Sequence, residues 1–201
     1  MTRIDHLVVA ARTLAEGVRY VEDALGVGMP QAGGKHPLMG THNRLMSLGG
    51  GAYLEVIAPD PDAPDPGRPR WFDLDRFRQP PRLVTWVARA DDLERHAALN
   101  LGTTHKASRG SLEWLIALPE DGRLHHGGAV PYLIQWGAAH PTDAMPDSRC
   151  RLEKLTAHAS NPSEVEGIWR RLGLEDGRLE CTEGSPGLAA LIHTPGGPKL
   201  L

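Results

Sequence analysis

Three segments of this sequence share one plan, and an internal repeat limits the possible folds more than any single motif does. Each segment opens with a short run rich in β-forming residues, and each run is followed by the start signal of a helix. The three runs lie at 3–11, 82–90 and 151–159. The repetition predicts that related β-α units follow one another along the chain.

The helix signals are clearest in the first segment. Thr13 and Glu16 form a capping box, in which the Thr oxygen accepts from the backbone and the Glu reaches back. Apolar residues then recur at helical spacing, and Gly26 ends the run because glycine enters the left-handed conformation without steric cost. The other two segments carry equivalent signals at 91–102 and 161–173.

Strand-like runs follow each predicted helix, at 43–48 and 52–57, at 112–118 and 132–136, and at 188–193. Each unit therefore has the order β-α-β-β-β, or part of it, and the predicted fold class is α+β. We expect two βαβββ modules at 1–58 and 82–141, joined by a linker at 59–81. A shorter third β-α-β unit, a partial βαβββ extension at 151–201, is expected to pack on the same domain.

The linker differs in kind from the modules. The chain holds 23 glycines and 17 prolines, which favours short elements with tight turns and excludes a long-helix or coiled-coil protein. Five of the prolines lie at 59–69 and make that stretch stiff and solvated. Trp71, Phe72, Leu74 and Phe77 follow, so the segment must bury something. It is either a lid over a pocket or a loop pinned to the domain surface.

Charge and cysteine content exclude several classes of protein. The formal net charge is −3, which argues against nucleic acid as a partner. No segment approaches the ~20 apolar residues of a membrane span, so no membrane partner is expected. Cys150 and Cys181 do not make a disulfide framework. The first residues also reach charge too early for a signal peptide. We therefore expect a soluble, cytoplasmic protein.

Two polar residues in predicted strands are candidates for chemistry. Alternation places His6 on one strand face with Ile4 and Val8, and Glu55 on one face with Tyr53. A buried carboxylate is costly unless it is paired, hydrogen-bonded or bound to a metal. The pair is either two ligands of a divalent cation or a His–Glu hydrogen bond in the wall of the sheet.

Several motifs resemble one known family. They are IDHLVV at 4–9, GGKHPLMGTHNRL at 33–45, YLEVIAPD at 53–60, RGSLEW at 109–114 and PYLIQW at 131–136. Together they are similar to the glyoxalase-like domain family of the vicinal oxygen chelate superfamily. That superfamily also includes glyoxalase I, ring-cleaving extradiol dioxygenases and antibiotic-resistance (bleomycin-resistance) proteins.

The resemblance implies paired βαβββ modules with curled mixed sheets around a metal-centred cleft. Metal-using members take ligands from the first and last strands of each module, which points to His6 and Glu55 in the first. The second module offers Thr85, which departs from the pattern, and Gln135, or Ile134 if the register slips by one. His6, Glu55 and Gln135 would then hold Zn, Ni, Fe or Mn, and no organic cofactor is expected.

The run at 41–48 adds further candidates. His42 and Arg44 share one face of this predicted strand, and Asn43 lies on the other. If the first face lines the cleft, His42 is a ligand or general base and Arg44 pairs with an anionic group of the substrate. Alternatively, His42 and Asn43 stabilise a loop. His36 lies in a glycine-rich loop that either folds over a ligand or is merely exposed. The substrate-binding candidates are thus His36, Asn43 and Arg44.

Three functions stay open on the sequence. The first is a metal-dependent enzyme in which the ion chelates a small oxygenated molecule, with His42 or Glu55 moving a proton, as lyase, isomerase or dioxygenase. The second is a protein that binds or sequesters a small molecule without metal or catalysis. The third is a structural domain with a closed, dry cleft. All three functions are compatible with a homodimer, in which the partner is a second copy of the chain.

Overall fold

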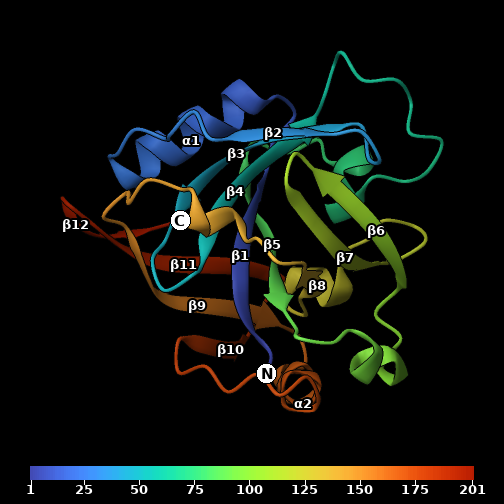
Figure 1. Cartoon of the computed structure of the whole chain (residues 1–201). Coiled ribbons are helices and arrows are strands. Elements are labelled where there is room, and N and C mark those ends of the chain that lie inside the picture. Colours follow the sequence, from blue (N-terminus) through green and yellow to red (C-terminus); the bar gives the residue numbers. More distant parts are fainter.

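Twelve strands form two mixed sheets in the computed structural model, which describes all 201 residues (Figure 1). The larger sheet has the order β2-β3-β4-β1-β5-β8-β7-β6. Its strands are β1 (Arg3–Ala10), β2 (Gly33–His36), β3 (Thr41–Ser47), β4 (Tyr53–Pro59), β5 (Arg82–Arg89), β6 (Thr103–Arg109), β7 (Leu112–Leu118) and β8 (Tyr132–Trp136). The smaller sheet, in the order β10-β9-β11-β12, contains β9 (Arg151–Ala159), β10 (Leu179–Glu183), β11 (Gly187–Thr194) and β12 (Gly197–Leu200).

Helix α1 (Leu14–Leu25) connects β1 to the hairpins of the first module. Thr13 and Gly26 cap it as predicted: the Thr13 side chain accepts from the Glu16 backbone N–H at 3.2 Å, and Gly26 adopts φ 67°. The other half of the predicted capping box does not form, because the Glu16 carboxylate pairs with Arg12 instead of reaching back. The helix lies very close to β4, because a Cβ added at Gly17 would be 2.5 Å from Val56 Cγ1. Glycine at this position therefore sets how near the helix packs to the sheet.

The second module repeats the strand order of the first but not its helix. Only a 3₁₀ turn, η2 (Glu94–Leu99), stands where a short α-helix was expected, and no side chain caps its start. A six-residue segment without a cap gains too few i→i−4 hydrogen bonds to form a stable α-helix. Three further 3₁₀ turns are η1 (Trp71–Arg76), η3 (His125–Gly128) and η4 (Pro141–Asp143).

The two modules meet in the middle of the larger sheet, where β1 and β5 pair antiparallel. Each of these strands also pairs parallel with the last strand of its own module, β1 with β4 and β5 with β8. The sheet curls so far that its edge strands β2 and β6 come into contact. These features confirm the predicted α+β fold class, with paired βαβββ modules and curled mixed sheets.

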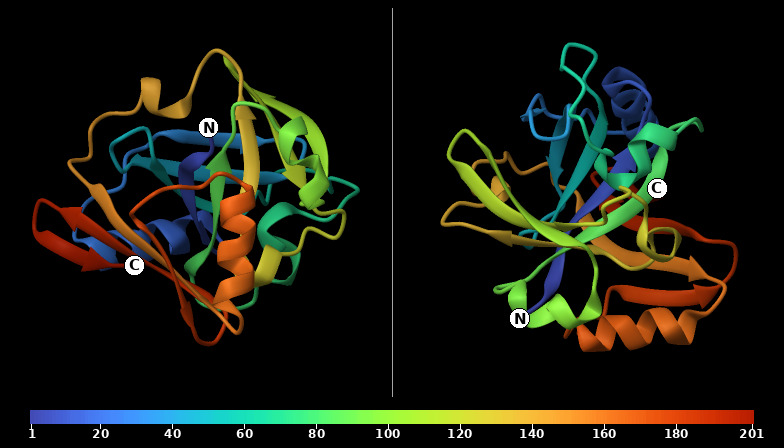
Figure 2. Two further views of the ribbon diagram at one scale, coloured as in Figure 1. Left: turned by 90° about the horizontal axis from the view of Figure 1, so that it is seen from below. Right: turned by 90° about the vertical axis from the view of Figure 1, so that its right-hand side faces the viewer.

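The C-terminal unit packs on the outer face of the larger sheet, and α2 (Pro162–Arg171) lies beside β9 and β10, where it also contacts β5 of the larger sheet (Figure 2). Strand β9 pairs parallel with β10 on one side and antiparallel with β11 on the other. Trp169 of α2 and Trp86 of β5 both donate an indole N–H to the Ala129 carbonyl, each at 3.1 Å. One cluster of buried apolar residues runs through both sheets and both helices.

The second half of the linker at 59–81 packs against the larger sheet. Trp71, Phe72 and Leu74 of η1 are buried in a second apolar cluster on the concave side of the larger sheet. The aromatic half of the linker thus covers part of the concave face.

Neither α1 nor α2 is long and apolar enough to cross a membrane.

Candidate functional site

A β-bulge in β1 brings two adjacent polar residues to the concave side of the sheet. The register between β1 and β5 shifts between Ile4 and His6, so Asp5 is the extra residue. Ile4 belongs to the apolar cluster on the outer face of the sheet, whereas His6 lines the cavity on the concave face. The predicted grouping of Ile4 with His6 is therefore wrong, because the bulge breaks the period-2 alternation.

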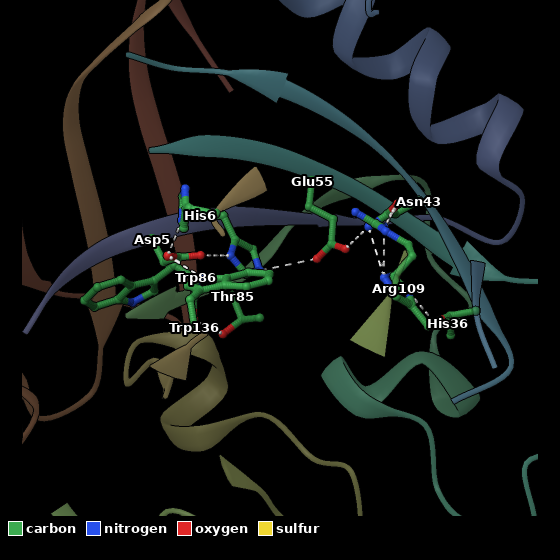
Figure 3. Close-up of polar contacts among 11 residues, drawn as sticks. Asp5, His6, His36, Asn43, Glu55, Thr85, Trp86, Arg109 and Trp136 are labelled. Atoms are coloured by element: carbon green, nitrogen blue, oxygen red, sulfur yellow. Dashed lines mark hydrogen bonds and ion pairs between the residues drawn. The ribbon is translucent and has the colours of Figure 1, made fainter. Parts of the chain in front are cut away.

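His6 lies between two carboxylates (Figure 3). Its Nδ1 is 2.7 Å from Asp5 Oδ1, and its Nε2 is 3.4 Å from Glu55 Oε2. The ring stacks on Tyr53 with centroids 4.5 Å apart. Burial lowers the pKa of His6, but the hydrogen bonds to Asp5 and Glu55 outweigh it and raise that pKa to about 9. His6 is therefore an imidazolium at neutral pH, with one N–H toward each carboxylate.

The two carboxylates are held in their ionised forms. Burial raises the pKa of Glu55, but hydrogen bonds from His6 and Asn43 bring it below the usual value. The pKa of Asp5 is likewise raised by burial and lowered further by its hydrogen bonds with His140 and His6, so that it lies well below its ordinary range. Asp5 also accepts from Trp136 Nε1 at 3.0 Å. Each charge of the Asp5–His6–Glu55 chain thus has an opposite or polar partner.

Asn43 continues this chain toward the edge of the sheet. Its Nδ2 donates to Glu55 Oε1 at 2.6 Å, and its Oδ1 accepts from the Arg109 guanidinium at 2.9 Å. His36 Nε2 lies 3.3 Å from both the Asn43 amide nitrogen and Arg109. Burial lowers the pKa of His36 to about 4, so this imidazole is neutral at pH 7. The row of contacts runs from β1 through β4, β3 and β2 to β6 (Figure 3).

These groups meet at a narrow cavity of about 30 Å³, roughly the volume of one water molecule. Its polar lining is His6, Glu55, Asn43, His36 and Arg109, and its other walls are mostly aromatic or aliphatic: Leu45, Tyr53, Trp71, Phe72, Trp114, Ile116, Ile134 and Trp136. The first module thus supplies most of the polar side of the cleft. The second module and the linker supply most of the apolar side.

Comparison with known families agrees with this architecture. Residues 4–173 match the family of glyoxalase-like domains. The chain belongs to that family. It is therefore a member of the vicinal oxygen chelate superfamily, as the motifs predicted.

Solved structures are similar to the chain at low sequence identity, and the first of the following shares its fold. A hypothetical protein from Staphylococcus aureus is 12% identical, with a TM-score of 0.63 over 92% of this chain and 88% of that one. Methylmalonyl-CoA epimerase from Mycobacterium tuberculosis is 19% identical, with a TM-score of 0.44 over 70% and 91%. A hypothetical protein from Bacillus halodurans is 10% identical, with a TM-score of 0.41 over 69% and 96%. No curated protein matches the chain.

In this glyoxalase-like domain, the second module has neither His nor Glu at the positions where the superfamily's metal ligands are expected. Val8 pairs with both Thr85 and Glu55, and the equivalent Val87 pairs with both His6 and Tyr132. Thr85 thus stands where His6 stands in the first module, and Tyr132 stands where Glu55 stands. Gln135 faces the opposite side of β8 and accepts from the Leu93 backbone N–H at 3.0 Å. Gln135 was expected to point into the cleft, but the register of β8 turns it to the other face of the strand.

His42 and Arg44 also lie outside the cleft. Strand β3 turns Asn43 toward Glu55, and alternation sends its two neighbours to the outer face. There they line a separate hollow of about 900 Å³ between α1 and β3. His42 was a catalytic candidate and Arg44 a substrate-binding candidate only if their face of the strand lined the cleft, and it does not. His36 and Asn43 do lie at the cavity, and their roles remain predictions.

The residues present do not fit a metal ion with three protein ligands. No three His, Cys, Asp or Glu side chains lie close enough together to hold one. Thr85 and Tyr132 direct their hydroxyls to the carbonyls of Gly128 and Arg123. The His6 imidazolium would have to lose a proton before it could ligate. We therefore derive no chemical step through a metal.

Sequence reasoning missed Asp5 and Arg109 as members of the site. Period-2 alternation would put Asp5 on the face opposite His6, and nothing in the residue pattern marks the bulge that reverses it. Arg109 lies on the second module, far from Asn43 in sequence, so only the curl of the sheet joins them. The RGSLEW motif at 109–114 was the one available signal.

Proposed function

We propose that this chain binds a small oxygenated molecule in the cavity beside His6 and Glu55 and catalyses proton transfer on it. The observation that carries the proposal is the buried Asp5–His6–Glu55 chain at the cavity. Neighbouring acid and base groups whose pKa values are driven apart are typical of acid–base sites. Membership of the glyoxalase-like family supports a small-molecule ligand.

The roles follow from the protonation states. Glu55 is ionised and can accept a proton from a carbon next to a carbonyl group. The electron pair of that C–H bond moves onto the carbonyl oxygen, and the Nε2–H of His6 supplies the proton that this oxygen takes up. The ligand leaves as its enol, or regains a proton at the same or a neighbouring carbon, so the balanced reaction is an isomerisation. Asp5 holds the orientation and charge of His6.

The test is exchange of acidic C–H protons with solvent. Protein freed of metals with chelator is incubated in D₂O with short 2-oxo acids, ketones and aldehydes, and ¹H NMR follows the loss of the C–H signal. We expect catalysed exchange with at least one compound, falling by at least about 100-fold in Glu55→Gln, the scale of a lost general base. The exposed Glu175→Gln is the matched control and should exchange at the wild-type rate.

Equal exchange in Glu55→Gln and wild type would contradict the proposal, as would exchange that appears only after a divalent metal is added.

A second function is favoured by one specific observation. The cavity is small, and His6, Glu55 and Asn43 already bond to one another within it. This arrangement also suits a protein that binds or sequesters a small molecule without reaction. Thermal stabilisation by a ligand with no C–H exchange would select this function over catalysis.

A further inference from the structure

Arg109 is the one polar residue that the second module contributes to the cavity. It ends β6, immediately before the two-residue turn of the β6–β7 hairpin. From there it crosses to the other edge of the curled sheet, where its guanidinium bonds Asn43 Oδ1 at 2.9 Å and His36 Nε2 at 3.3 Å. The guanidinium therefore bridges the two edges of the sheet at the cavity (Figure 3).

Arg109 has no partner of opposite charge, whereas the other charged groups at the cleft each have one. Glu55 is paired with His6, and Asp5 with His6, His140 and Arg89. No carboxylate oxygen lies within 4.0 Å of the Arg109 guanidinium, although the side chain is half-buried. A partly desolvated cation without a counter-ion is costly, and a guanidinium fork matches a carboxylate in both charge and shape.

We propose that Arg109 binds a carboxylate group of the ligand, so that the molecule recognised at this site is a small carboxylic acid anion. The inference rests on the proposed function and names the chemical class of its ligand. Trp71 supports it, because this residue lines the cavity and its buried indole Nε1 has no hydrogen-bond partner. Trp71 therefore adds to the cavity wall a donor that has no partner in the protein.

The spacing of the polar groups limits the length of the ligand. Asn43 bonds Arg109 through its oxygen and Glu55 through its nitrogen, so one amide group spans the distance between them. A carboxylate on Arg109 and a C–H group at Glu55 therefore belong to adjacent or next-but-one carbons. A 2-oxo or 3-oxo acid has this arrangement. The cavity holds about one water molecule, so a short acid enters only as the aromatic side chains around it, Trp114 and Trp136 among them, move apart.

Gly34 of β2 positions Arg109. A Cβ at Gly34 would lie 2.7 Å from Arg109 Cδ, which is closer than van der Waals contact allows. Gly34 does not have a left-handed φ, so an alanine there changes the space and not the backbone preference. Gly34→Ala should therefore displace the guanidinium while every other polar side chain of the site stays in place.

The experiment compares a carboxylate with its neutral isostere. Binding of 2-oxobutyrate and of 2-oxobutanamide is measured by calorimetry for wild type, Arg109→Gln and Gly34→Ala. We expect Arg109→Gln to weaken 2-oxobutyrate at least tenfold and to change the weaker binding of the amide by less than about twofold. Gly34→Ala should weaken the acid selectively as well. The exposed Arg95→Gln is the matched control for loss of one positive charge, and its affinity for the acid should equal that of wild type.

Equal affinity of wild type for the acid and the amide would overturn the inference, and so would an Arg109→Gln variant that weakens both alike while its circular dichroism is unchanged. Failure of the proposed function is distinguishable from either result. If 2-oxobutyrate binds in an Arg109-dependent way but its C3 protons never exchange, the inference on ligand class stands and proton transfer fails. If neutral ketones exchange without dependence on Arg109, the reverse holds.

Discussion

Asp5 determines the chemistry available to His6. Without it, a buried imidazole beside one carboxylate would share a single proton; with it, both ring nitrogens have an anionic partner. Because the folded-state pKa of about 9 lies above the ordinary histidine value of 6.5, protonated His6 stabilises the fold fully below pH 6.5. That contribution is lost as the pH rises through about 9.

At the residue scale, part of the site follows from residue type alone. His6 and Glu55 were predictable because polar residues inside apolar strands need partners, and they are each other's partners. Asp5 and Gln135 could not be placed, because a one-residue shift of a strand reverses the face of every side chain after it. The bulge in β1 and the register of β8 are such shifts, and they arise from pairing with distant strands. For His42 and Arg44 the alternation was predicted, but not which face of the strand lines the cleft.

Elements were easier to predict than sites, since their signals are local. The caps of α1 at Thr13 and Gly26, and of α2 at Asn161, form as the sequence indicates. The helix of the second module was wrong, because a capping-box pattern at 91–94 does not make a six-residue segment helical without a side-chain cap. Capping favours a helix but does not replace its length.

Two helical glycines allow a matched test of how close α1 lies to β4. Gly17→Ala places a Cβ 2.5 Å from Val56 Cγ1, whereas Gly167→Ala in α2 meets nothing nearer than 3.9 Å. We expect Gly17→Ala to lower the free energy of unfolding by about 1–3 kcal/mol through overpacking. Gly167→Ala should raise it by about 0.5–1 kcal/mol through helix propensity. Urea unfolding of both variants measures this, and a stabilised Gly17→Ala would contradict the packing described.

At the scale of the whole molecule, the repeat in the sequence predicted the paired modules but not the pairing of the C-terminal strands. In the first module the first strand pairs parallel with the last, β4, whereas β9 pairs parallel with the next strand along the chain, β10. Sequence periodicity shows that strands exist and not which edges they join. This unit shares its apolar cluster with the larger sheet.

The shared cluster predicts that the whole chain unfolds as one cooperative unit. Trp169→Ala removes a buried indole and its hydrogen bond to Ala129, and it should cost about 3–5 kcal/mol. Hydrogen exchange should then show amide protection falling together in β1 and β9. The exposed Leu200→Ala in the same unit should change stability by less than about 0.5 kcal/mol. Loss of protection in β9 alone would show instead that the C-terminal unit is a separate domain.

The central claim is that His6 is the charged acid of a proton-transfer pair and not the ligand of a metal. The direct measurement is a titration of the His6 ring nitrogens by ¹⁵N NMR from pH 5 to 10, with and without added Zn²⁺. We expect both nitrogens to stay protonated through neutral pH, to titrate near pH 9 and to be unaffected by Zn²⁺ at pH 7. A neutral ring at pH 7, or an Nε2 signal that shifts as Zn²⁺ binds, would contradict the account.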